Sequence, residues 1–151
     1  MSGTGKADRE VQIDRVIDAP RELVFAAFTD PTQLAIWWAP EGLEIPADTV
    51  EVDGRVGGRI NFSMVDPNSG QDYPVRFEIV EMTEPEVLVL ESPPVPELGM
   101  PERIVTRLTF EEDGGRTRLS VTQGPHTEEM VPQALAGWTS ILEKLDAMTA
   151  S

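Results

Sequence analysis

Hydrophobic residues near the start of the chain change from the spacing of a strand to the spacing of a helix. The first group alternates with polar positions, which predicts a strand: Val11, Ile13 and Ile17. The next group falls on a single helical stripe: Val24, Phe25 and Phe28. We therefore expect a strand that is followed directly by a helix.

Two short helices are predicted between Ala19 and Gly42. Pro20 suits the first position of a helix, where its missing N–H costs nothing, and Asp18 is a candidate acceptor for the exposed amides. Because the residue before a proline avoids the helical region, Asp30-Pro31 ends the first helix and begins the second. The second helix has an apolar side: Leu34, Trp37 and Trp38.

Six further strands are predicted after these helices, and most of them are joined by tight turns. The alternation of apolar and polar residues is clearest over residues 60–64. Residues 66–70 and 113–115 have the composition of hairpin turns, so the sheet is expected to be antiparallel. Residues 92–101 are rich in proline and predict an irregular loop. The predicted strands cover residues 44–52, 60–64, 73–82, 87–90, 104–110 and 117–121.

The last predicted element is a long amphipathic helix over residues 127–148. Its apolar residues recur at helical spacing: Met130, Ala134, Gly137, Trp138, Ile141, Leu142 and Leu145. We expect Gly137 to allow a close approach to the sheet, because a glycine inside a helix costs about 1 kcal/mol and needs compensation. The predicted fold is α+β, with an antiparallel sheet of about six to seven strands curved around this helix. The two short helices follow the first strand and cover the space between sheet and helix.

Composition and charge limit the domain count and the partners. A chain of 151 residues with 40% hydrophobic residues predicts one domain over residues 9–151, after a flexible tail over residues 1–8. The net charge of −15 and the pI near 4.3 argue against binding to nucleic acid or to an anionic membrane. With no cysteine and one histidine, neither a metal site nor another cofactor is expected. The chain has no predicted secretory signal or membrane span, so a cytoplasmic location is expected.

Several short motifs carry a resemblance to a known family: Ala19-Pro20, Val24-Phe25, Thr29-Asp30-Pro31, Trp37-Trp38 with Pro40 and Gly42, Gly57-Gly58, and Gly137-Trp138. In their order and spacing, from about Val11 to about Met148, the chain resembles the START-like (SRPBCC, Bet v-like) helix-grip superfamily. The branch that it resembles is that of the Hsp 90 ATPase activator homologues. The resemblance implies an apolar cavity between sheet and helix that binds lipids, polyketides or aromatic molecules.

The resemblance leaves three functions open, because a shared fold does not determine function. The first is non-catalytic binding of a hydrophobic small molecule. The second is an enzyme of the polyketide cyclase or aromatase kind, which would need polar side chains inside the cavity. The alternation of the strands instead predicts an outward orientation for four such residues: Arg59, Asn61, Arg76 and Glu78. The third is a protein-interaction role, as an activator of a chaperone ATPase or as a homodimer.

The candidate ligand-binding residues are those expected to face the cavity. Trp37 and Trp38 either frame the cavity mouth or anchor the second helix to the sheet. Met64 and Met130 would supply adaptable walls, since methionine fills irregular gaps. The complete set is Trp37, Trp38, Phe62, Met64, Phe77, Leu108, Met130, Trp138 and Arg15.

Two titratable residues allow more than one interpretation. Arg15 lies in the inward register of the first strand, so it either binds a ligand carboxylate or is paired with an acidic side chain. His126 titrates near neutrality and is a conceivable general base. No nucleophile or orienting acid lies at a diagnostic spacing from it, which favours a loop or capping role just before the terminal helix. No catalytic residue is assigned.

Overall fold

A computed structural model describes residues 7–40, 42–94 and 102–149 of the chain. The strands in this part are β1 (Ala7–Ile17), β2 (Glu51–Val52), β3 (Arg59–Val65), β4 (Asp72–Thr83), β5 (Val87–Ser92), β6 (Ile104–Asp113) and β7 (Arg116–Thr127). The helices are α1 (Arg21–Thr29), α2 (Pro31–Trp37) and α3 (Val131–Thr149), with short 3₁₀ helices η2 (Ala47–Thr49) and η4 (Glu128–Met130). This element order confirms the predicted α+β helix-grip fold.

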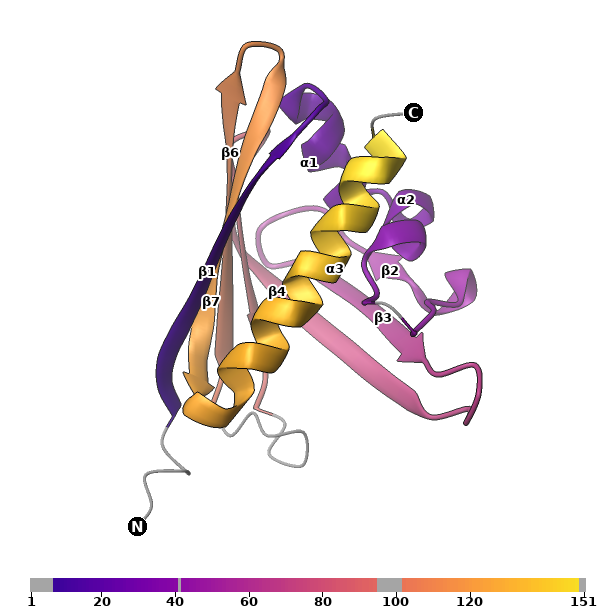
Figure 1. Ribbon diagram of the computed structural model, residues 1–151. Coiled ribbons are helices and arrows are strands. Elements are labelled where there is room, and N and C mark those ends of the chain that lie inside the picture. Colours follow the sequence, from indigo (N-terminus) through magenta and orange to yellow (C-terminus); the bar gives the residue numbers. More distant parts are fainter. Residues whose placement is uncertain (1–6, 41, 95–101, 150–151) are drawn as a thin grey trace.

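The strands form one antiparallel sheet that bends around α3 (Figure 1). The strand order across the sheet is β1-β7-β6-β5-β4-β3-β2, so each strand from β2 to β6 pairs with the next one along the chain. β1 completes the other side by pairing with β7. α3 follows β7 after η4 and crosses the sheet on the side where α1 and α2 also lie.

The boundary between α1 and α2 lies at Asp30, as predicted. The side-chain amide of Gln33 donates a hydrogen bond of 3.1 Å to the carboxylate of Asp30, and the backbone N–H of Thr32 donates another of 3.0 Å. Both contacts, that of Gln33 the more strongly, lower the pKa of Asp30. The predicted start of α1 is wrong. Pro20 occupies the N-cap, and no side chain caps the helix there, so Asp18 does not have the expected role.

Three other predicted boundaries differ from the structure. The predicted strand over residues 44–52 is reduced to β2, because Pro46 precedes the 3₁₀ helix η2. β7 continues well beyond residue 121, and the terminal helix begins with η4 before α3. β1 begins at Ala7 and so includes two residues of the predicted tail. Residues 1–6, the remainder of that tail, and most of the predicted loop over residues 92–101 lie outside the described residues.

Aromatic side chains of α1 pack on β6 in the core. The ring of Phe110 lies 5.1 Å from that of Phe25 and 5.5 Å from that of Phe28, measured between centroids. The predicted apolar stripe of α1 is buried, and so is the stripe of α3 formed by Trp138, Ile141, Leu142 and Leu145. Burial of these side chains supplies most of the favourable free energy of folding. Over β3 and β4, the side chains of the helices leave a pocket instead of packing closely on the sheet.

Candidate functional site

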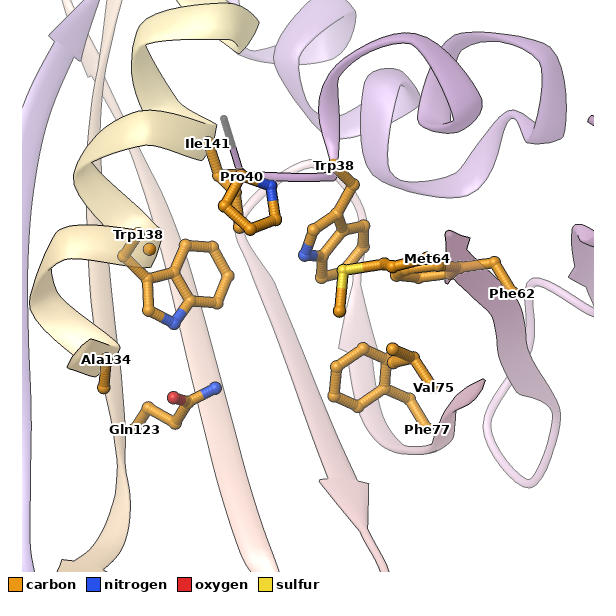
Figure 2. A pocket seen from close by; sticks show the side chains of 11 residues that line it. Trp38, Pro40, Phe62, Met64, Val75, Phe77, Gln123, Ala134, Trp138 and Ile141 are labelled. Carbon is orange, nitrogen blue, oxygen red and sulfur yellow. The ribbon is translucent and has the colours of Figure 1, made fainter. Parts of the chain in front are cut away.

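A pocket of about 200 Å³ lies between α3 and the part of the sheet formed by β3 and β4 (Figure 2). The segment that follows α2 and one residue of β7 complete its walls. The lining side chains are predominantly apolar, as is usual for sites that take small molecules. They are Trp38, Pro40, Phe62, Met64, Val75, Phe77, Gln123, Ala134, Gly137, Trp138 and Ile141.

The sheet side of the pocket follows from the pairing of β3 with β4. The register sets Phe62 opposite Val75, and side chains two residues apart in a strand point to the same face. Met64 and Phe77 therefore reach the pocket beside this pair. The structure thus places three of the candidate residues, Phe62, Met64 and Phe77, in the lining.

The helix side of the pocket is a single stripe of α3. Ala134, Gly137, Trp138 and Ile141 are spaced three and four residues apart, so they lie on the same face of the helix. The close approach to the sheet that was predicted for Gly137 is wrong, because a Cβ placed there would meet nothing within 4 Å. The missing side chain of Gly137 instead leaves space inside the pocket.

Trp38 connects the two sides of the pocket. Its ring stacks on Phe77, with centroids 5.5 Å apart and an interplanar angle of 24°. It also contacts Phe62 at 5.5 Å and Trp138 at 6.2 Å. The ammonium group of Lys144 donates a hydrogen bond of 2.7 Å to the carbonyl oxygen of Ala39, which ties the segment after α2 to α3. The position of Trp38 at the pocket is thus fixed by its ring contacts and by the hydrogen bond at the neighbouring residue Ala39.

Trp37 has a different role from its neighbour. It is fully buried, it is absent from the pocket lining, and its indole N–H donates a 3.0 Å hydrogen bond to the carbonyl oxygen of Ala27. Its ring meets Phe28 edge-on at 4.6 Å. These contacts fix α2 against α1. The predicted anchoring to the sheet describes Trp38, which packs on Phe62 and Phe77 and also lines the pocket, whereas these contacts of Trp37 join α2 to α1.

One end of the pocket is polar, and sequence analysis missed the residue that makes it so. The amide nitrogen of Gln123 donates a hydrogen bond of 2.8 Å to the hydroxyl of Thr106, which lies directly opposite on β6. The amide oxygen of Gln123 lies 2.9 Å from Nε2 of His126. Thr106 and His126 are buried, with exposed fractions of 0% and 3%. Gln123 thus joins a buried polar network to the pocket.

The predicted loop position of His126 is wrong. The residue lies in β7, because the strand continues to Thr127. Burial lowers the pKa of its imidazole, which favours the neutral form. A neutral ring with its proton on Nε2 donates to the amide oxygen of Gln123. The other ring nitrogen, Nδ1, is buried and has no partner among the described residues.

Besides Trp37, three candidate residues do not line the pocket. Leu108 faces the same side of the sheet but is fully buried within the core. Met130 lies in η4 and is partly buried. Nη2 of Arg15 lies 3.1 Å from the carboxylate of Asp146 on α3, so the pairing of this arginine with an acidic side chain is the interpretation that the geometry favours.

The four polar residues predicted to point outward line a separate hollow of about 300 Å³ instead of the pocket: Arg59, Asn61, Arg76 and Glu78. Arg103 lies in the same hollow and forms ion pairs with Glu78 at 3.4 Å and Glu91 at 2.6 Å. A third hollow, of about 540 Å³, is also lined by charged side chains, including Arg21 and Glu86. Of these three hollows, the pocket between sheet and α3 is the one with apolar walls.

The described residues contain no group of three or more histidine, cysteine, aspartate or glutamate side chains that could hold a metal ion. Among the helices of residues 7–40, 42–94 and 102–149, none combines the length and the apolar character needed to cross a membrane.

Comparisons with known proteins agree on the fold. The model of the family described as "Activator of Hsp90 ATPase homolog 1-like protein" matches residues 18–150. A crystal structure from Chromobacterium violaceum has a TM-score of 0.84 and 28% identity, and the match covers 94% of this chain and 97% of that one. The AHSA1 protein of Silicibacter pomeroyi has a TM-score of 0.76 and 28% identity, with coverages of 94% and 98%. A search of curated proteins finds no match.

Proposed function

This chain belongs to the Activator of Hsp90 ATPase homolog 1-like family, and we propose that it binds a hydrophobic small molecule in the pocket between the sheet and α3 without converting it chemically. One observation carries the proposal. Four aromatic rings border a space of about 200 Å³ that no described side chain fills: those of Trp38, Phe62, Phe77 and Trp138.

Filling this space with an apolar molecule is favourable, because it removes apolar surface of both partners from water. A ligand ring that stacks on Trp38 or Trp138 gains about 0.5–1.5 kcal/mol beyond this burial. The loss of translational and rotational freedom on association offsets much of the gain. We therefore expect micromolar affinity for a compound of one or two rings.

The chemistry of the lining supports binding over catalysis. General acid–base catalysis needs a titratable group within hydrogen-bond reach of the reacting atoms. Gln123 is the one lining residue with an amide or hydroxyl side chain, and the amide does not titrate near neutrality. His126 meets the pocket only through Gln123. A cyclase-like reaction would therefore lack a proton donor or acceptor in contact with its substrate.

The proposal can be tested with tetralin, a bicyclic hydrocarbon, as the probe. We expect tetralin to shift the indole N–H resonances of Trp38 and Trp138 in a ¹H–¹⁵N NMR titration and to leave that of Trp37 nearly unchanged. The third tryptophan is an internal control, because it is buried outside the pocket. A shift of all three resonances by similar amounts would indicate non-specific association and contradict the proposal.

A substitution that fills the pocket makes the test sharper. Gly137→Phe places a ring in the space where a Cβ meets no other atom, so it should reduce tetralin affinity at least ten-fold. Ala136→Phe is the matched control, since Ala136 is the neighbouring exposed residue of α3. If Gly137→Phe fails to fold, Ala134→Leu tests the same wall. Unchanged tetralin affinity in a folded, pocket-filling variant would overturn the proposal.

A further inference from the structure

The pocket presents several hydrogen-bond donors and almost no free acceptor. Within the described part of the chain, the indole N–H groups of Trp38 and Trp138 donate to no partner, whereas that of Trp37 donates to Ala27. Figure 2 shows both indole nitrogens turned toward the interior of the pocket. The amide nitrogen of Gln123 carries two hydrogens, and Thr106 accepts one of them. The second N–H of this amide therefore remains available.

The orientation of the Gln123 amide follows from its two buried partners. The amide oxygen of Gln123 faces Nε2 of His126 at 2.9 Å, and the neutral tautomer with its proton on Nε2 makes this contact a hydrogen bond. The hydroxyl of Thr106 faces the amide nitrogen. With this tautomer, exchanging the oxygen and the nitrogen of the amide would place two N–H groups against each other at His126. Thr106 and His126 are thus positioning residues, and they make Gln123 present an N–H rather than a carbonyl to the pocket.

The pocket contains no charged side chain among its described lining residues. A carboxylate ligand would lose its hydration without gaining a partner of opposite charge, and the net charge of −15 repels it further. A cation would be attracted by this charge and by the faces of the aromatic rings. It would nevertheless meet the donor N–H groups of Gln123 and Trp138 at the polar end. An uncharged ligand with a hydrogen-bond acceptor satisfies all these conditions.

The size of the pocket restricts the ligand further. A volume of about 200 Å³ is only somewhat larger than the roughly 150 Å³ of an apolar cavity that binds benzene. It is also smaller than the ~300–1,000 Å³ typical of sites for drug-sized molecules. One or two fused rings therefore fit, whereas a sterol or a long acyl chain does not fit within this space.

We propose that the ligand is an uncharged one- or two-ring compound bearing a carbonyl oxygen, and that Gln123 selects it by donating a hydrogen bond to that oxygen. This inference rests on the proposed function, since it names the ligand class of the same pocket. The aromatic rings supply affinity for any apolar ring of the right size. Gln123, held by Thr106 and His126, distinguishes the ketone from the hydrocarbon of the same shape.

The experiment compares 1-tetralone with tetralin, which share a skeleton and differ by one carbonyl oxygen. We expect 1-tetralone to bind about five-fold more tightly, since a neutral hydrogen bond contributes a net factor of roughly two to twelve. It should also move the side-chain amide resonances of Gln123, which tetralin should not. Two charged analogues should bind more weakly than the ketone: 1-aminotetralin, which is an ammonium ion, and tetralin-1-carboxylate.

Substitutions then assign the preference to particular side chains. Gln123→Leu keeps a similar volume but removes the amide, so it should make the affinities of that variant for 1-tetralone and tetralin equal. Gln133→Leu, at an exposed position of α3, is the matched control and should change neither value. His126→Phe should reduce the ketone preference while tetralin affinity stays within about two-fold, a pattern that a purely structural role would not produce.

The possible outcomes separate this inference from the proposed function. Tetralin binding that Gly137→Phe blocks supports the pocket, whatever the result with the ketone. Equal affinity for 1-tetralone and tetralin, or a ketone preference that survives Gln123→Leu, would overturn the inference and leave the proposed function standing. Tighter binding of the ammonium or carboxylate analogue than of 1-tetralone would likewise overturn it. Failure of tetralin to bind at all would contradict both.

Discussion

His126 couples the protonation of one side chain to the stability of the fold. Burial in β7 lowers the pKa of its imidazole from the ordinary value of 6.5. The unfolded chain therefore binds a proton at this residue at a higher pH than the folded chain does. The stabilisation is complete above the unfolded pKa and is lost as the pH falls below it, toward the lowered pKa of the folded state.

We predict that the free energy of unfolding decreases between about pH 7.5 and about pH 5.5, by at most about 1.4 kcal/mol per pH unit for one proton. The His126→Phe variant should lose this component, because the chain has one histidine. Urea unfolding of both proteins at the two pH values measures the difference. Equal pH dependence in the wild type and the variant would show that His126 is not responsible.

Trp37 stabilises the packing of α2 on α1 and does not line the pocket. The carbonyl oxygen of Ala27 lies in the last turn of α1, where helical carbonyls lack intrahelical partners, and Trp37 supplies the donor. Trp37→Phe should reduce the free energy of unfolding by about 2 kcal/mol, through the unpaired carbonyl and the lost volume. Tetralin affinity should remain within about two-fold of the wild type.

Trp38→Leu provides the contrast, since its ring lines the pocket. We expect it to weaken tetralin binding several-fold, through the loss of stacking. Urea unfolding and NMR titration of both variants measure the two effects separately. If Trp37→Phe weakened binding as strongly as Trp38→Leu, the division of roles between the two tryptophans would be wrong.

Among the helices and strands, the periodicity of apolar residues predicted most of the sheet and α3, but it predicted only some of the residues that line the pocket. Alternation in β3 and β4 identified Phe62, Met64 and Phe77, because residues two apart share a face of a strand. Trp138 followed from the helical stripe of α3. Periodicity could not separate Leu108 from these residues, because both core and pocket lie on the same face of the sheet.

The polar end of the pocket was harder to predict. Gln123 continues the alternation of Leu119 and Val121 in β7, so an extension of the strand by two residues would have placed it on the inner face. Because glutamine is polar, nothing in the sequence indicates that the apolar alternation of the strand continues beyond Val121. The β6–β7 register places Thr106 opposite Gln123. His126 lies three residues further along β7 itself, next to an irregularity in the β1–β7 register, and strict alternation does not predict its contact with Gln123.

Over the whole molecule, the excess of acidic residues produces electrostatic repulsion that the local ion pairs do not cancel. The net charge is −15, with 27 acidic and 12 basic residues. The ion pairs among the described residues have partly exposed side chains, and such pairs contribute about 0–1 kcal/mol each. Repulsion between like charges is therefore expected to dominate the electrostatic free energy of the folded state.

Screening this repulsion should stabilise the fold without affecting an uncharged ligand. Between about 0.02 M and about 0.5 M NaCl the Debye length falls to a few ångströms. We predict a gain of about 1 kcal/mol in the free energy of unfolding, or roughly 2–4 °C in the midpoint of thermal unfolding. KCl should act equally if the cause is screening rather than specific ion binding.

Across the same range the affinity for 1-tetralone should stay constant, because no charge enters the pocket. A salt-dependent affinity for this neutral probe would indicate that charged groups near the pocket contribute to recognition.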